Sequence, residues 1–189
     1  MAEQILADAD GEFDRDRYDF DIIGEVVKAI LDPSNEVTSQ LGAAAQVVDG
    51  GITAFLPNDR AFQLLAWDLT GKWIRDESKI IPAILSVVDL QTVNTIVEYH
   101  VIAGATIDSA AALQADGVSL TSVMGASFTV DVLNQKRALV RLIDNDRNDW
   151  DPFLVRSKLD NVASNGIWHG ISQVLRPIDV GTKWEWRVR

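Results

Sequence analysis

The stretch of sequence with the clearest chemical potential is an acidic run of eight residues from Asp144 to Asp151. Within it, Asp144, Asp146 and Asn148 stand at alternate positions, which is the spacing of the first three ligands in a calcium-binding loop. Oxygen ligands gathered on one flexible loop suit a hard cation such as Ca²⁺. The spacing therefore raises the hypothesis of a weak calcium site, and the alternative is a solvated acidic loop.

The rest of this run departs from an EF-hand. Asp149 stands at the sixth position, where that loop requires glycine, and Val155 stands at the twelfth position, where a bidentate glutamate closes the site. The sequence thus excludes an EF-hand, although it leaves open a calcium site of another kind. We expect no required cofactor, because no other residue pattern indicates one.

The chain has two histidines, and both fall on apolar faces of expected elements. His100 lies on the apolar stripe of a helix expected over residues 90–101, and His169 shares a strand face with Ile167 and Ile171. Buried polar side chains in such places are normally hydrogen-bonded core residues. We predict that both histidines are structural, and that replacing either with alanine lowers stability before it affects binding.

The sequence lacks the short motifs that organise common active sites. It contains no Gly-x-Ser-x-Gly elbow, no P-loop, no Gly-x-Gly-x-x-Gly and no His-Glu-x-x-His. Carboxylates are abundant, so a hydrolase with two carboxylates about 5–10 Å apart stays as a minor alternative. Apart from that alternative, we expect a chain without enzymatic activity.

Composition limits both the fold and the partners. The 189 residues and a hydrophobic content of 47% suit one folded domain with extensions. The net charge of −11 disfavours nucleic acid and anionic membranes, and it permits cations, basic proteins and neutral glycans. There is no cysteine, and no segment approaches the roughly 20 apolar residues of a membrane span. The acidic first residues do not resemble a signal peptide.

Helical patterns dominate the sequence before residue 117. The clearest boundary follows an apolar strand over residues 52–56, where Pro57 stops the sheet ladder and Asn58 can cap the next helix. We expect the first helix to be capped by Asp19 or Asp21 and to end before Pro33, and further helices over residues 34–48, 59–70, 79–88, 90–101 and 109–114.

Strand patterns replace the helical ones after residue 117. Phe128, Val130 and Val132 alternate with polar residues, which predicts a half-buried strand over residues 127–132. A turn that follows would return the chain as the second strand of a hairpin. We expect the other strands over residues 120–123, 137–143, 153–157 and around 165–171.

Three segments, in order, resemble the sequence boxes of the fasciclin-type (FAS1) domain family. The first runs from Thr53 to Phe62, the second is Tyr99-His100-Val-Ile-Ala-Gly, and the third begins at Asn165-Gly166 and closes with Val-Leu-Arg-Pro177. The resemblance covers about residues 19–179. It implies that the matching residues are framework residues: Thr53, Phe55, Pro57, Asn58, Phe62, His100, Asn165, Gly166 and His169.

The resemblance implies an α+β fold, in which a β-sandwich or wedge of mostly antiparallel strands is covered by helices from the N-terminal half. The strand near residue 52 must then join strands far along the chain. The resulting division has three parts: an acidic N-terminal arm over residues 1–18, a FAS1-like domain over 19–179 and a strand-like extension over 180–189.

The resemblance also implies a non-enzymatic adhesion or ligand-binding module at the cell surface or outside the cell. Its partner would be a cell-surface or matrix protein or a polysaccharide, and a self-associating structural domain is the main alternative. Trp184 and Trp186 alternate with charged residues, which predicts one apolar strand face. This face would pack on the domain, stack on sugar rings or pair with another copy of the chain. From expected exposure, the candidate contact residues are Tyr99, Trp150, Trp184 and Trp186.

Overall fold

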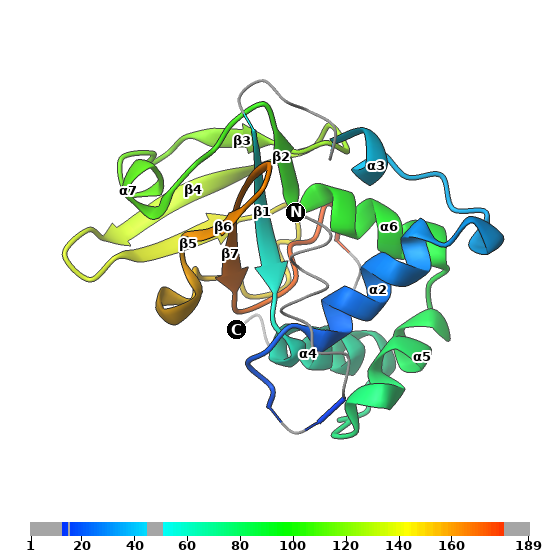
Figure 1. The fold of residues 1–189 in the computed structure, drawn as a ribbon. Coiled ribbons are helices and arrows are strands. Elements are labelled where there is room, and N and C mark those ends of the chain that lie inside the picture. Colours follow the sequence, from blue (N-terminus) through cyan, green and yellow to red (C-terminus); the bar gives the residue numbers. More distant parts are fainter. Residues whose placement is uncertain (1–12, 15, 45–50, 180–189) are drawn as a thin grey trace.

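Strand β1, Ile52–Pro57, is the central element of the computed structural model, which describes residues 13–14, 16–44 and 51–179 (Figure 1). It is buried along its whole length, as its apolar sequence predicts, and it lies inside a four-stranded sheet with the order β2-β1-β7-β6. The other strands of this sheet are β2 (Val101–Ala103), β6 (Asn161–Ala163) and β7 (Gly166–Ile171).

A second sheet contains three antiparallel strands in the order β3-β4-β5. These strands are β3 (Ser119–Thr121), β4 (Ser127–Asn134) and β5 (Leu139–Ile143). Phe128 and Val130 are buried, which confirms the alternation predicted for β4. The two sheets together form one half of the molecule, on one side of the helices (Figure 1).

Most of the described helices lie on the other side of β1 (Figure 1). The longer ones are α2 (Asp21–Leu31), α4 (Asp59–Thr70), α5 (Ile80–Leu85) and α6 (Leu90–Tyr99). Two single-turn helices, α3 (Leu41–Ala44) and α7 (Ser109–Ala112), and three 3-10 turns complete the helical part. The expected α+β class is therefore confirmed.

Strand β1 separates two hydrophobic cores. Ala54 and Leu56 project into the core made with the helices, whereas Phe55 projects into the core between the two sheets. Phe55 meets Phe128 of β4 edge to face, with ring centroids 5.5 Å apart. One short strand thus joins both halves of the molecule.

The β1–β7 pair is parallel, and the other strand pairs of the described sheets are antiparallel. The backbones of β1 and β7 approach closely at Gly166, where a Cβ atom would lie 2.0 Å from the carbonyl oxygen of Ile52. Only glycine fits there without moving the strand. This contact confirms that the early strand joins the end of the chain, as expected.

Helix α4 begins and ends where the sequence predicts. The Asn58 side chain accepts a hydrogen bond from the backbone N–H of Ala61 at 3.0 Å, and Gly71 adopts a left-handed φ of 73° just after the last turn. By contrast, neither Asp19 nor Asp21 caps α2, whose N-cap is Phe20 and has no side-chain cap bond.

The helix predicted over residues 34–48 is present only as α3 within the part that the structure describes. A 3-10 turn over Pro33–Asn35 ends at Glu36, which has a left-handed φ of 52°, and the chain then has no regular secondary structure until α3. Side chains of α6 hold this segment, because the backbone N–H groups of Thr38 and Gln40 donate to Gln91 and Glu98. Residues 45–50 lie outside the described part.

Other predicted elements are shorter in the structure, and two of the differences have a clear cause. Helix α6 ends at Tyr99, two residues early, because Val101 leaves it to pair with β1. The strand expected over 153–157 is reduced to isolated bridges at Phe153 and Leu154, followed by a 3-10 turn. In both cases a tertiary contact overrides the local pattern.

Both histidines are buried and hydrogen-bonded through both ring nitrogens, as predicted for core residues. His100 Nδ1 donates to the carbonyl oxygen of Ile96 at 2.7 Å, and Nε2 accepts from the N–H of Leu175 at 2.8 Å. His169 Nε2 donates to Ile107 O at 2.8 Å, and Nδ1 accepts from Asp160 N. Each pattern requires a neutral ring, because each ring has one acceptor nitrogen.

Other framework residues of the sequence boxes also serve the sheet. Thr53 Oγ1 donates to Ala105 O at 2.9 Å and accepts from Ile107 N at 2.8 Å, so it fixes the loop that precedes α7. The carbonyl oxygen of Asn165 accepts from Ile52 N, and Phe62 is buried in the helical core. These contacts explain the boxes as structural elements.

No single helix of the described residues is long and apolar enough to span a membrane. The segments Glu77–Leu85 and Leu90–Tyr99 meet the length and composition requirements only as a pair, and they are bent by 109°.

Replacing Gly166 with alanine should destabilise the protein by about 3 kcal/mol or more, because the added methyl group would force β7 away from β1. Urea unfolding monitored by circular dichroism measures this change. Gly42→Ala is the control, since a Cβ atom there has nothing within 4 Å. Equal stabilities of the two variants would contradict the close approach.

The contribution of His100 to stability should fall as the pH drops from about 6.5 to about 4. Burial lowers the pKa of His100 to about 4, although its bond to Ile96 acts in the opposite direction. The unfolded chain therefore binds a proton near pH 6.5 that the folded chain does not bind, and at pH 5 this difference costs about 2 kcal/mol. Between pH 7 and pH 5, the change in the free energy of unfolding should be about 2 kcal/mol less unfavourable in His100→Gln than in the unmodified protein. An unchanged pH effect would reject this assignment.

Candidate functional site

The acidic loop folds into a series of turns that its own side chains stabilise. Asp144 Oδ1 accepts from the N–H of Asp146 at 2.9 Å, and Asp146 Oδ1 accepts from the N–H of Asn148 at 3.0 Å. The Asn148 amide donates to Asp179. The alternate spacing that suggested calcium ligands therefore serves local hydrogen bonds.

Arg176 supplies the cation for this loop. Its side chain is buried, and the residue is only 2% exposed. Its guanidinium lies 2.8 Å from Asp68 of α4, 3.3 Å from Asp146 and 2.6 Å from Asp149. Burial acts to lower the pKa of Arg176, but the carboxylates of Asp149, Asp68 and Asp146 raise it, so the group stays charged.

The backbone of Arg176 also binds the loop, since its N–H donates to Asp144 Oδ2 at 2.8 Å. Burial raises the pKa of Asp144 to about 7, although the N–H donors of Arg176 and Asp146 act to lower it. Calcium at Asp144, Asp146 and Asn148 stays a prediction, and the structure provides protein donors for the carboxylate oxygens of Asp144 and Asp146.

These ion pairs place Trp150 beside two tryptophans from another part of the chain. An open cleft, which we call the tryptophan cleft, contains Trp67 of α4, Trp73 of the following turn and Trp150 of the acidic loop. Trp67 and Trp73 meet edge to face, with ring centroids 5.8 Å apart. The other residues that line the tryptophan cleft are Arg60, Leu64, Asp68, Asp149 and Gln173.

Polar groups hold the aromatic walls of the tryptophan cleft. The Arg60 guanidinium lies over the ring of Trp73, 4.5 Å from its centroid. With its amide nitrogen directed at the loop, Gln173 donates to the carbonyl oxygens of Trp150 at 2.9 Å and Asp151 at 3.0 Å. The cleft thus combines flat apolar faces with charged and amide groups, which is the composition of many ligand sites.

The four residues predicted to contact a ligand differ in where the structure places them. Trp150 is 69% exposed, which confirms the exposure expected of it. Tyr99 is fully buried between the sheets, and its hydroxyl donates to the carbonyl oxygen of Ser127 at 2.8 Å, so its assignment as an exposed contact residue is wrong. Trp184 and Trp186 lie outside the described residues.

Sequence reasoning missed the association of Trp67 and Trp73 with Trp150. A usable signal existed for part of the cleft, since Arg60, Leu64 and Trp67 recur at helical spacing and occupy one face of α4. The position of Trp150 beside this face could not be inferred, because it depends on the distant Arg176.

The tryptophan cleft also bears on the hydrolase alternative. Asp68 and Asp149 are the carboxylates that line it, and both contact the same Nη2 atom of Arg176. A general acid and a nucleophile need different environments, which one shared ion pair does not provide. The geometry of this cleft therefore favours binding over acid–base chemistry.

Together these features define an α+β domain whose candidate site lies on an exposed loop and a helix face. A family model described as the fasciclin domain matches residues 31–177, so the chain belongs to the fasciclin domain family. Fasciclin domains are generally non-enzymatic adhesion modules and occur in extracellular or cell-surface proteins.

A solved structure of a FAS1 domain pair from the insect cell adhesion molecule fasciclin I is similar to this chain. The two share 15% sequence identity with a TM-score of 0.45, over 90% of this chain and 48% of that chain. This chain thus spans about half the length of that one. The search of curated proteins found no match to this chain.

Replacing Arg176 with methionine should lower stability by about 3–5 kcal/mol, because it leaves buried carboxylates without their cation. Arg156→Met is the matched control, since Arg156 is exposed and should tolerate the change within about 0.5 kcal/mol. Chemical unfolding of the two variants measures the difference. A loss below about 1 kcal/mol for Arg176→Met would show that the acidic loop is held by other contacts.

Proposed function

We propose that this chain is a non-enzymatic adhesion module that acts at the cell surface or outside the cell and binds a neutral polysaccharide in the tryptophan cleft. The observation that supports this proposal most is the gathering of Trp67, Trp73 and Trp150 around one open cleft. A tryptophan offers a large, rigid apolar face together with a polar N–H, and such a face suits the flat side of a sugar ring.

The polar groups of the cleft suit sugar hydroxyls. Arg60 offers donors and Asp149 offers acceptor oxygens, while the Gln173 amide nitrogen donates to the loop backbone. Hydroxyl groups both donate and accept, so a rim with both kinds of partner can bind them. This mixture favours a polyhydroxylated ligand over a purely apolar one.

Charge favours a neutral glycan over an acidic one. The chain has a net charge of −11, which repels sulfated or carboxylated polysaccharides. Within the tryptophan cleft, the positive charge of Arg60 is accompanied by the carboxylates of Asp68 and Asp149. The cleft therefore has no excess positive charge with which to recruit an anion.

An open cleft that holds one or a few sugar rings binds weakly by itself. Adhesion then depends on many copies that engage a repetitive polymer together, since linked binding events raise the apparent affinity by about 10²–10⁴-fold. A polysaccharide provides such repetition. This mode of binding agrees with a site that is shallow and exposed.

Replacing Trp150 with alanine should weaken binding to a neutral polysaccharide by about tenfold or more, because it removes the most exposed aromatic wall of the cleft. Affinity electrophoresis in gels that contain one neutral polysaccharide each measures this change. Trp73→Ala should also weaken binding, because it removes a second wall.

Tyr18→Ala is the matched control, since Tyr18 is 67% exposed and does not line the tryptophan cleft. It should bind as the unmodified protein does, and all variants should melt within a few degrees of it. Unchanged binding by Trp150→Ala, or binding to matrix proteins alone, would overturn the proposal. Concentration-dependent sedimentation that Trp150→Ala abolishes would instead support self-association through this surface.

A further inference from the structure

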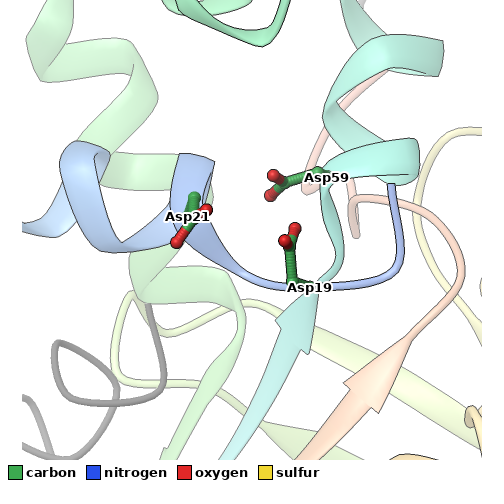
Figure 2. Close-up of side chains that lie close together, drawn as sticks. All are labelled: Asp19, Asp21 and Asp59. Carbon is green, nitrogen blue, oxygen red and sulfur yellow. The ribbon is translucent and has the colours of Figure 1, made fainter. Parts of the chain in front are cut away.

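Three aspartates meet between the N-terminal ends of α2 and α4, away from the acidic loop (Figure 2). Asp19 and Asp21 lie at the start of α2, and Asp59 is the first residue of α4. Each offers one carboxylate oxygen, and these oxygens all lie within 4.8 Å of one another. Two ligands of one Ca²⁺ ion can lie up to about 5 Å apart, so a single ion can reach all three.

Burial distinguishes this cluster from ordinary surface carboxylates. Asp59 is only 1% exposed. Its Oδ1 atom accepts from the N–H of Ile22 at 3.0 Å, but its Oδ2 atom is buried and has no hydrogen-bond donor among the described residues. Figure 2 shows that the carboxylates of Asp59 and Asp19 face each other. A buried oxygen without a donor is costly, and a cation in this space would satisfy it.

The described residues do not supply that cation. No Lys, Arg or His side chain within them forms an ion pair with Asp19 or Asp59. Glu77 adds a fourth buried carboxylate whose charge acts on Asp59, and its Oε2 atom also has no donor within the described part of the chain. This situation is the opposite of the one at Arg176, where each carboxylate meets a guanidinium.

The charge of the site matches a divalent ion. The N-terminal ends of α2 and α4 each contribute about half a positive charge. Burial and the hydrogen bond with Asp19 raise the pKa of Asp59 to about 9, so a bound cation would displace a proton there. The three ionised aspartates would then leave about two negative charges. Ca²⁺ tolerates irregular geometry and takes 6–8 oxygen ligands, including water. Asp19 is half-buried, so the ligands that complete the coordination shell can come from solvent.

We infer that Asp19, Asp21 and Asp59 form a binding site for a divalent cation, with Ca²⁺ as the ion that fits best. The bound ion would join the N-terminal ends of α2 and α4, which are already connected by the N–H of Asp59 donating to Asp19 O at 3.1 Å. Its main effect would therefore be on the stability of the helical half of the domain.

The test is the melting temperature of chelator-stripped protein in calcium, in magnesium and in chelator. At a free calcium concentration about 100 times the Kd, the unmodified protein should melt about 5–10 °C higher than in chelator. Asp59→Asn keeps the size of the side chain and an oxygen for the Ile22 N–H, but it removes one negative charge. It should lose the calcium shift and melt in chelator at the same temperature as the unmodified protein or above it.

Two control variants separate this site from other carboxylates. Asp76→Asn removes an exposed carboxylate of the same region and should keep the full shift. Asp144→Asn tests the acidic loop and should also keep the full calcium shift in melting temperature. If Asp59→Asn does not fold, Asp19→Asn replaces it, because that side chain is partly exposed. The inference is overturned if the unmodified protein shows no shift, or if only Asp144→Asn loses it. A shift of similar size in magnesium would support a site for divalent cations in general.

Discussion

The buried guanidinium of Arg176 determines the geometry of the surface that we propose for binding. It lies just past β7, and it connects Asp68 of α4 with Asp146 and Asp149 of the acidic loop. Removing these charges from water is costly, and close ion pairs offset the cost only when all the partners are in place. The loop is therefore held in one position against α4, and Trp150 is placed by a charge cluster instead of by apolar packing.

The arginine can reach this position because β1 and β7 fix the segment that follows Ile171 in the centre of the molecule. Side chains of β1 alternate between two cores, and its backbone pairs with a strand more than a hundred residues away. Gly166 permits the close approach, while His100 accepts from the N–H of Leu175, next to Arg176. The sequence boxes thus act together: each contributes contacts that hold the C-terminal segment where the ion pairs need it.

This dependence explains what the sequence could and could not predict. The ends of α4 were predictable, because Asn58 and Gly71 act on their immediate neighbours. The burial of Tyr99 was not, because its helix places it at the edge of the apolar stripe, and the sheet that covers this edge comes from later residues. The sequence also could not identify Arg176 as the partner of the acidic loop, because the spacing of the loop carboxylates suits a metal ion as well as a distant guanidinium. The tryptophan cleft depends on the same long-range contacts.

Helix α4 carries residues of both proposed sites, and the two differ in how charge is balanced. Near its C-terminal end the buried Asp68 meets a protein cation, and Arg60 and Trp67 line the tryptophan cleft. At its N-terminal end, Asp59 faces another carboxylate, with one buried oxygen that has no donor among the described residues. A fold that provides a buried arginine for one acidic cluster is able to neutralise carboxylates internally. Among the described residues Asp59 has no such partner, and this is the stronger reason to assign that end of the helix to an ion from solution.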